Sequence, residues 1–345
     1  MADGTFGSQT TLLSETSLPE MTDLVRRNWV WTRENIVRNA KQLFIEEGVG
    51  SGQGNSKRYN EVDVETYADA KAEGANSQKA KVGVGYFMDM TARTFSKEVD
   101  ITLEMRNDNR YAEVGTYIQN LSEFCDNRLD LDLTHRLTFA GDTSYTDMNG
   151  ELVTTEVGDG LALVSAAHTL AFSSTTYSNS VSGAPAFSES ALESALLIAA
   201  TSIYSNFGEK RTLRFNKIVT GDDPSTVRTV RQILQSTADI DAAQSGVANV
   251  YNSKFDHVIL PNLATTAVGA YNSAKRRYWF LAAAGQGMNG WQAFVGTWIA
   301  PTLLTPNDSN SGMDIHTFNW TYSAYCRYGV VTVSPRGLIG SLVVS

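Results

Sequence analysis

Residues 109–137 read NRYAEVGTYIQNLSEFCDNRLDLDLTHRL. Apolar side chains recur here every three or four residues, which is the spacing of one face of an α-helix. The spacing predicts a long amphipathic helix. His135 falls near its end without a second His or Cys at ligand spacing, so we interpret it as a surface residue at the helix terminus. The predicted buried stripe is Val114, Ile118, Leu121, Cys125 and Leu129.

Two stretches suited to extended structure precede this helix. Residues 58–68 and 82–105 alternate apolar and polar side chains with the period of two that is typical of strands. Residues 69–81 between them contain no apolar residue larger than alanine. We predict a long hairpin that projects from the body. Because a lone hairpin is marginal in water, we expect it to rest on another subunit.

The N-terminal part is predicted to be an arm and a helix. Residues 1–19 are rich in Ser, Thr and Gly, as in a flexible arm, and residues 48–56 have the composition of a linker. Helical spacing predicts a helix over 21–47 with a basic face, which is either solvated or docked against an acidic partner, a neighbouring subunit or DNA. That face comprises Arg26, Arg27, Arg33, Arg38 and Lys41.

Downstream of the long helix, helical and extended patterns alternate, so the predicted class is α+β or mixed α/β. Ser188 or Ser190 is expected to cap a helix at 186–208, and Gly208 to end it. A helix at 223–236 has a proline in its first turn, and the acidic residues before it suit a helix N-terminus. Strands are expected at 213–221, at 255–263 and in three apolar stretches after a loop at 304–312.

Composition limits the functional classes. The 345 residues are 42% hydrophobic and 19% charged, which fits a folded protein with a sizeable core. The net charge of −9 disfavours tight binding to DNA phosphates. The two cysteines, Cys125 and Cys326, are far apart and suggest a reducing compartment. No signal peptide and no apolar run of membrane-spanning length is apparent, so we expect a soluble protein.

The stretch DGLALVSAAH at 159–168 brings an aspartate, a serine and a histidine close together in sequence. A nucleophilic serine is usually marked by a strained turn such as G-x-S-x-G, and Ser165 lies between Val164 and Ala166. We therefore interpret the stretch as a turn, a short strand and a histidine, His168, that hydrogen-bonds nearby backbone. No catalytic residue is predicted.

Other candidate motifs carry no clear chemistry. GQGMNG at 285–290 matches a dinucleotide-binding pattern by letters, but the preceding WFLAAA lacks β-branched residues and no βαβ unit surrounds it. We predict no metal site and no cofactor, because the histidines are scattered. Tryptophans cluster in the last quarter, where core or subunit contacts are expected. The histidines are His135, His168, His257 and His316; the tryptophans are Trp279, Trp291, Trp298 and Trp320.

The order of these parts resembles the major capsid (head) proteins of tailed bacteriophages, which have the Hong Kong 97-type fold, and most of all their Mu-like branch. Residues 215–221 depart from the family pattern because they lack a proline at the strand end. The stretches that carry the resemblance are DGLALVSAAH (159–168), YSNSVSG (177–183), FNKIVTG (215–221), NVYNSKFDHVILPNL (249–263), YWFLAA (278–283) and SPRGLIGS (334–341).

The resemblance implies an α+β capsid fold in five parts. These are an N-terminal arm at 1–56, an extended hairpin loop at 57–107, a peripheral domain with a spine helix at 108–164, an axial domain at 165–300, and C-terminal strands at 301–345 that return to the peripheral domain. It implies a virion protein, assembled in the host cytoplasm, whose pentamers and hexamers form an icosahedral shell around double-stranded DNA. Interfaces rather than pockets then carry the function, and no enzymatic role is expected.

The implied partners are other copies of the chain, a separate scaffolding protein, a portal, a possible decoration protein and, weakly and non-specifically, the packaged DNA, but no membrane. Some family members form covalent cross-links through a lysine in the extended loop. Lys71, Lys79 and Lys81 lie in that region, and we expect no cross-linking.

Two other classes stay open. A tail-tube or surface-layer subunit would share the acidic, motif-poor composition. A serine hydrolase whose residues converge only in space would use Ser165, His168 and an acid such as Asp159.

Overall fold

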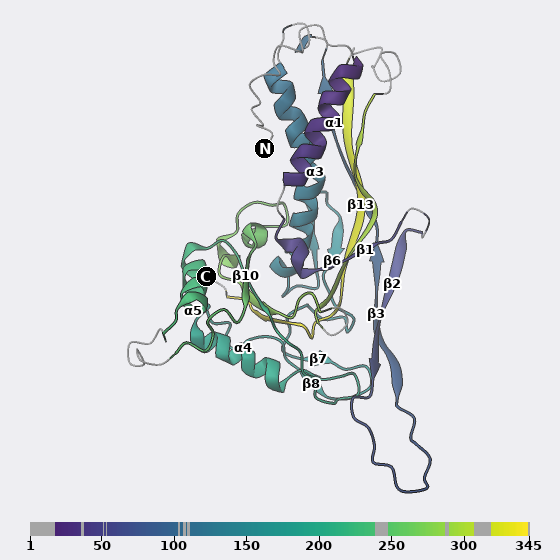
Figure 1. The fold of residues 1–345 in the computed structure, drawn as a ribbon, viewed down its shortest axis with the longest axis vertical. Helices are drawn as coiled ribbons and strands as arrows, with labels where there is room; N and C mark the ends of the chain where they lie inside the picture. Colours follow the sequence, from purple (N-terminus) through teal and green to yellow (C-terminus); the bar gives the residue numbers. More distant parts are fainter. Residues whose placement is uncertain are drawn as a thin grey trace.

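The fold is α+β, as the sequence predicts, with two lobes and a projecting two-stranded ribbon (Figure 1). The structure is a computed structural model, and most of the arm expected at 1–19 lies outside the residues it describes. The described residues are 18–35, 38–50, 52, 54–102, 104–105, 108, 111–238, 248–286, 290–306 and 319–343.

The first lobe is built on α3 (Tyr111–Thr138), the long helix that the sequence predicts. All five residues of its predicted stripe are buried. Helix α1 (Leu18–Asn35) packs along α3, and α3 packs in turn against a sheet with strand order β1-β12-β13-β4. These strands are β1 (Ile45–Gly48), β12 (Gln292–Leu304), β13 (Trp320–Ser334) and β4 (Arg93–Ile101).

The second lobe contains α4 (Glu189–Thr201), α5 (Pro224–Gln235) and a sheet with strand order β10-β9-β11-β14. Ser188 caps α4, as expected, by accepting a hydrogen bond from the Ala191 amide. Asp223 caps α5 in the same way. The apolar faces of both helices share one core with β11. The strands are β10 (Asp256–Ile259), β9 (Lys217–Thr220), β11 (Trp279–Ala282) and β14 (Leu338–Ser341).

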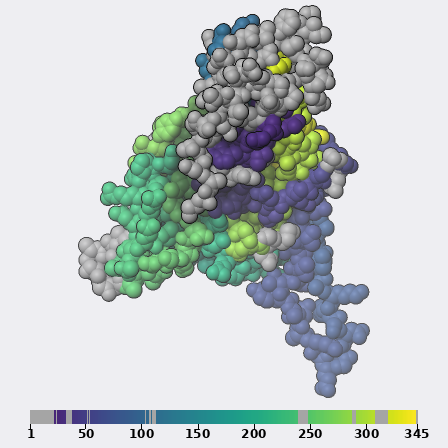
Figure 2. Space-filling model, turned by 45° about the horizontal axis from the view of Figure 1, so that its top comes forward, coloured from purple at the N-terminus to yellow at the C-terminus, as the bar shows by residue number. Residues whose placement is uncertain are grey.

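The ribbon consists of the antiparallel strands β2 (Ser56–Val64) and β3 (Val82–Thr91), joined by a loop at 65–81. Only Ala92 separates β3 from β4, so the ribbon is a direct extension of the first sheet. The space-filling view shows the loop at the end of the ribbon projecting from the body (Figure 2). The predicted hairpin is therefore present, with its returning segment divided into β3 and β4.

Short elements complete the described fold. Two small hairpins lie between the long helix and the second lobe, and three 3-10 turns interrupt the loops. The four tryptophans of the last quarter are all buried, as expected. The hairpins are β5 (Ser144–Thr146) with β6 (Leu152–Thr154) and β7 (His168–Thr169) with β8 (Thr176–Tyr177); the turns are Ala40–Leu43, Pro261–Ala264 and Ser273–Lys275.

The prediction of a helix over 21–47 is wrong beyond the middle of that range. Helix α1 ends at Asn35, and residues 45–48 form β1, which pairs in parallel with residues 294–297 of β12. Phe44, just before β1, is buried with its ring 5.2 Å from that of Trp291. The partner strand lies some 250 residues away in sequence, and this tertiary pairing overrides the local helical pattern.

The prediction that His135 lies on the surface is also wrong. Its side chain is 1% exposed, and Nε2 lies 3.1 Å from the hydroxyl of Thr265. The rings of Phe139 and Tyr145 contact the imidazole edge-on. The end of α3 is covered by the turn at 261–264 and by β5, neither of which can be inferred from the helix's own sequence.

Two further boundaries differ from the prediction. Helix α4 ends at Thr201, and Gly208, with φ +86°, closes a separate turn in which its amide bonds to the Ser205 carbonyl. Of the C-terminal segment 301–345, β13 lies in the first sheet as expected, whereas β14 pairs with β11 in the second lobe. The chain therefore ends by connecting the two lobes. The other domain boundaries stay a prediction.

We predict that His135 makes the fold sensitive to acid. Burial first, and then the positive charges of Arg128 and Lys275, lower the pKa of His135 to about 4, below the value of about 6.5 in an unfolded chain. Between these two values the unfolded state binds more protons. The free energy of unfolding should therefore fall as the pH drops through this window, by at most about 1.4 kcal/mol per pH unit from this group.

Urea unfolding of the parent and of His135→Gln, from about pH 7.5 to about pH 4.5, measures the effect. The variant should show the shallower dependence on pH. Equal slopes for the two proteins would contradict the prediction.

Candidate functional site

The ribbon presents its apolar side chains to solvent. Val62, Val64, Val82 and Val84 are 49%, 46%, 67% and 59% exposed. Val62 pairs with Val84 and Val64 pairs with Val82, and residues directly opposite each other on antiparallel strands lie on the same face. These four residues, called the valine face below, form one apolar patch that the described part of the chain leaves uncovered.

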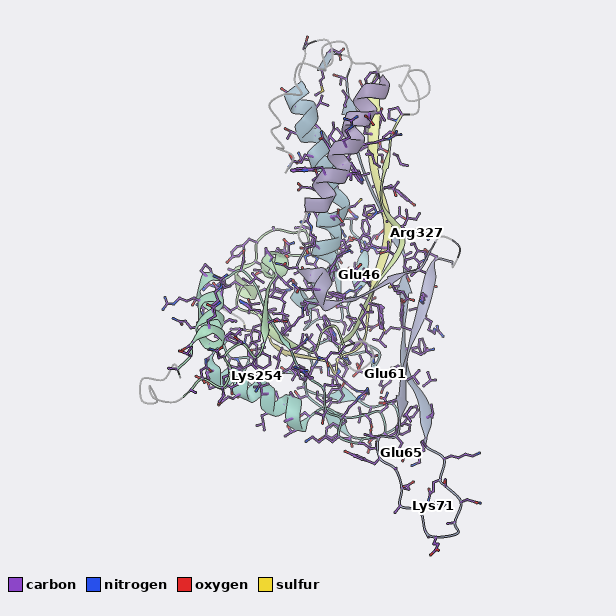
Figure 3. All side chains as sticks on the ribbon, in the orientation of Figure 1. Glu46, Glu61, Glu65, Lys71, Lys254 and Arg327 are labelled. Carbon is purple, nitrogen blue, oxygen red and sulfur yellow. The ribbon has the colours of Figure 1, made fainter. Side chains whose placement is uncertain are left out.

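The opposite face of the ribbon lies against the body and carries acids and glycines. Glu61 and Asp63 are buried although the valines beside them are not. A Cβ on Gly85 would lie 2.6 Å from Nδ2 of Asn206, and a Cβ on Gly83 would lie 2.3 Å from the ring of Phe172. The glycines allow the ribbon to approach the body this closely, and Figure 3 places Glu61 beside the body.

A buried group of polar side chains, called the ionic clamp below, holds this inner face. Nη1 of Arg336 lies 2.9 Å from Oε1 of Glu61 and 3.3 Å from Oδ2 of Asp63. Nη2 of Arg336 donates to Asn206 at 2.6 Å, and Asn206 donates in turn to both acids. Arg211, 3.6 Å from Asp63, adds a second positive charge. The clamp consists of Glu61, Asp63, Asn206, Arg211 and Arg336.

The clamp determines which face of β2 is turned outward. Side chains alternate along a strand, so burying Glu61 and Asp63 necessarily exposes Val62 and Val64. The alternation is visible in sequence and predicts a strand exposed on one face, but the usual assignment would bury the valines. The acids are buried because the body supplies Arg336, 273 residues away, as their partner.

The loop at 65–81 is exposed and polar beyond the clamp. Lys81 pairs with Glu65 at 3.1 Å, and the Thr66 amide donates to Glu209 at 2.6 Å, so the loop is fastened where it leaves the body. Lys71 and Lys79 are exposed, with Lys71 well out along the loop (Figure 3). Of the lysines singled out in sequence, Lys81 is therefore the one held in an ion pair.

A second charged cluster fixes the point where the ribbon joins the first lobe. Arg93, at the start of β4, bonds both Asp147 and Glu151 on the β5–β6 hairpin, and Arg128 on α3 lies 2.8 Å from Asp147. Burial alone would raise the pKa of Asp147, but hydrogen bonds from Arg93 and from two backbone amides lower it to about 2. The carboxylate stays ionised, and the cluster has a structural role.

The stretch 159–168 does not form a catalytic triad. Nδ1 of His168 lies 2.8 Å from Asp159, and Nε2 lies 3.2 Å from Oδ1 of the buried Asn179. Both ring nitrogens thus face acceptor oxygens, whereas a general base needs one nitrogen directed at the serine hydroxyl. Oγ of Ser165 instead accepts a hydrogen bond from the Ala167 amide. His168 is therefore bonded to side chains, and the expected bond to nearby backbone is wrong.

Asn179, which no local sequence pattern marks, organises this region. Its Nδ2 donates to the carbonyl of Leu163 at 2.8 Å and to that of Leu338 at 3.1 Å, while its Oδ1 accepts from the Ser165 amide. These bonds link the stretch at 159–168 to β14 next to Arg336. Its role is structural, and no local signal marks a buried asparagine of this kind.

A strand, β11, does precede GQGMNG, contrary to expectation, but the chain continues into strand β12 rather than a helix, and residues 287–289 lie outside the described part. No cluster of three His, Cys, Asp or Glu in the described residues could hold a metal ion. None of the described helices is both long enough and apolar enough to cross a membrane.

The predicted basic face of the first helix is engaged within the chain at several points. Arg26 donates to Thr305, Arg27 pairs with Asp23 at 2.5 Å, and Arg38 donates to Asn127. Lys41 lies 3.3 Å from Glu46. The side chain of Arg33 lies outside the described part. The contacts of Arg26 and Arg38 fasten α1 and the segment after it to the first lobe.

By sequence, the chain matches no family model and no curated protein. By structure, it is similar to chains of phage and GTA particles. The capsid of the cyanophage P-SCSP1u aligns with a TM-score of 0.49 at 12% identity, covering 88% of this chain and 87% of that one. The capsid of the native GTA particle gives 0.48 at 12%, covering 89% and 91%. A Gordonia phage Cozz chain gives 0.47 at 12%, covering 89% and 87%. At these scores and identities, the likeness assigns no activity to this chain.

We predict that removing Arg336 releases the ribbon. Arg336→Met would leave two buried carboxylates without their main partner, which typically costs about 3–5 kcal/mol. Urea unfolding should show a loss of that order, and hydrogen exchange should show β2 and β3 losing protection while α3 keeps its own.

The matched control is Arg58→Met, on the same ribbon. Arg58 pairs with Asp89 at the surface, so this variant should keep both stability and ribbon protection. Equal behaviour of the two variants would show that the ionic clamp does not hold the ribbon.

Proposed function

We propose that this chain is the major capsid (head) subunit of a tailed bacteriophage, with a Hong Kong 97-type fold, and that its pentamers and hexamers form an icosahedral shell around double-stranded DNA. The observation that carries the proposal is the valine face. The patch lies on a projecting, clamped ribbon and is covered by none of the described residues, which favours burial against another molecule.

A second copy of the same chain fits that role best. A two-stranded ribbon is marginal alone in water, and covering it on a neighbour removes apolar surface from solvent at roughly 25 cal/mol per Å². The ionic clamp fixes the ribbon's direction relative to the body. A fixed direction is what repeated, symmetric contacts between identical copies need.

The parts of the molecule support the corresponding roles. We assign residues 1–56 to an arm, 57–107 to the hairpin laid across a neighbour, 108–164 to the peripheral domain with α3 as its spine, and 165–300 to the axial domain. Residues 301–345 are shared, since β13 belongs to the first sheet and β14 to the second. Kinship with the Mu-like branch stays a prediction.

We further propose a virion location after assembly in the host cytoplasm, with a separate scaffolding protein, a portal and a possible decoration protein as partners. Contact with the packaged DNA should be weak and non-specific, because the chain carries a net charge of −9. No catalytic role is proposed. In particular, the geometry at His168 favours structure over hydrolysis.

Electron microscopy of the protein, co-expressed with its neighbouring genes or purified from its source, tests the function. Closed icosahedral particles are expected. Tubes or flat sheets would favour the tail-tube or surface-layer alternative. A small monodisperse species under all conditions would refute the shell, and labelling of Ser165 by a serine-reactive probe would then favour a hydrolase.

We predict that the valine face is needed for assembly but not for folding. Val82→Asp with Val84→Asp should leave the unfolding free energy nearly unchanged, since both side chains are exposed in the single chain. Closed particles should be lost, because charge would be buried at the subunit contact. The isosteric control, Val82→Thr with Val84→Thr, should retain partial assembly. Unimpaired assembly of the aspartate variant would contradict the prediction.

A further inference from the structure

Helices α4 and α5 each leave one face uncovered in the second lobe. Their inner faces meet in the shared core, through Ala191 and Leu192 on α4 and through Val230 and Ile233 on α5. Figure 1 shows the two helices on adjacent sides of this lobe. Both outer faces therefore point away from the chain's own core, in different directions.

The outer face of α4 carries small side chains, one exposed large apolar side chain and an acidic one. Leu197 is 63% exposed, and Glu193, one turn before it, is exposed as well. The hydroxyls of Ser194 and Thr201 donate to the carbonyls of Ser190 and Leu197 of the same helix, so they demand no outside partner. No Lys or Arg of the described residues pairs with Glu193, whose one contact is a 3.4 Å hydrogen bond from Tyr251.

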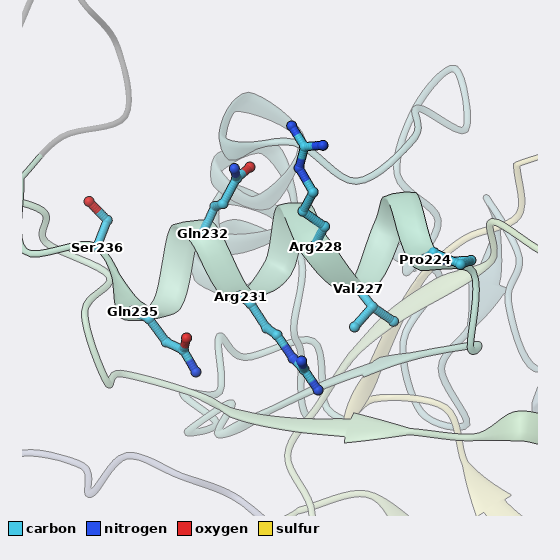
Figure 4. A pocket seen from close by; sticks show the side chains of 7 residues that line it. All are labelled: Pro224, Val227, Arg228, Arg231, Gln232, Gln235 and Ser236. Atoms are coloured by element: carbon cyan, nitrogen blue, oxygen red, sulfur yellow. The ribbon is translucent and has the colours of Figure 1, made fainter.

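The outer face of α5 is the complement of this surface. A shallow, open pocket lies along this helix and is called the α5 groove below; its described lining is Pro224, Val227, Arg228, Arg231, Gln232, Gln235 and Ser236. Figure 4 shows Arg228 and Gln232 along one side of the helix and Val227, Arg231 and Gln235 along the other. The helix contains no acidic residue, and neither arginine forms an ion pair with the described residues.

We propose that, in the assembled shell, α4 of one copy packs antiparallel in the α5 groove of the next copy, with Leu197 on Val227 and Glu193 paired with Arg231. The inference rests on the proposed function. Glu193 and Leu197 are four residues apart, or about 6 Å along a helix, and so are Val227 and Arg231. Antiparallel packing is the orientation that places the acid opposite the arginine once the two apolar side chains meet.

A head-to-tail contact of this kind suits a ring. Two different faces of identical copies form a heterologous interface, which generates a ring when the rotation from one copy to the next closes. The groove could alternatively hold the phosphates of DNA. Its apolar and amide side chains, with two arginines, favour a protein surface, and an exposed acidic helix of the same chain supplies the matching charge.

Variants with one added surface cysteine each test the contact directly. Leu197→Cys and Val227→Cys are expressed separately in the full chain, mixed, assembled and oxidised; the native Cys125 and Cys326 are buried. A disulfide-linked dimer should appear on a non-reducing gel from the mixture and not from either variant alone. Replacing Leu197→Cys in the mixture by Leu304→Cys should abolish the dimer; Leu304, on β12, is 53% exposed, against 63% for Leu197.

A charge exchange tests the pairing. Glu193→Arg and Arg231→Glu should each weaken the contact at least about tenfold at low salt, which corresponds to about 1.4 kcal/mol per contact, and should lower the assembled fraction. Both changes in one chain should restore assembly, because every contact then holds an exchanged pair. Thermal unfolding of each variant checks that the fold is intact.

Each outcome decides between the hypotheses. Closed particles without the cross-link, or no recovery in the double variant, would overturn the α4–α5 contact and leave the shell intact. Loss of DNA retention with normal assembly in Arg231→Glu would also overturn this contact. Failure of the parent chain to form particles under any condition would refute the proposed function and the contact with it.

Discussion

The buried pairing of Arg336 with Glu61 and Asp63 is the interaction on which the rest of the arrangement depends. Two carboxylates and a guanidinium are expensive to remove from water, and they are tolerated here because each is hydrogen-bonded within the ionic clamp. By burying the acidic face of β2, the clamp turns the valine face outward. Under the proposed function, the apolar exposure that this causes in the single chain is the basis for association between copies.

The rest of the molecule supports this one orientation. Gly83 and Gly85 let the ribbon approach the body, and the cluster of Arg93 with Asp147 fixes the ribbon where it enters the first sheet. Asn179 joins the stretch at 159–168 to the strand that follows Arg336. Residues that looked like candidates for catalysis, Asp159 and His168 among them, are therefore part of the framework that holds the ribbon's anchor in place.

Local pattern predicted the elements whose stability is local. The stripe of α3, the caps of α4 and α5 and the projecting hairpin could all be read from spacing and turn residues. The wrong predictions concern residues whose structure depends on distant partners. Ile45–Gly48 is a strand because β12 pairs with it, and His135 is buried because the turn at 261–264 covers it. The inward direction of Glu61 could not be predicted either, since its partner Arg336 lies near the other end of the chain.

The position of β14 has a consequence for biosynthesis. This strand, with Arg336 just before it, is synthesised long after the ribbon, since Asp63 and Arg336 lie 273 residues apart, yet it completes the sheet of the second lobe and the anchor of the ribbon. Pairings between residues so far apart in sequence form slowly, because a long loop must close before they contribute. A nascent chain therefore holds an unanchored ribbon until Arg336 has been synthesised, and the valine face takes its final direction only from then on. Under the proposed function, this delay separates synthesis of the ribbon from polymerisation and protects crowded polysomes from premature aggregation.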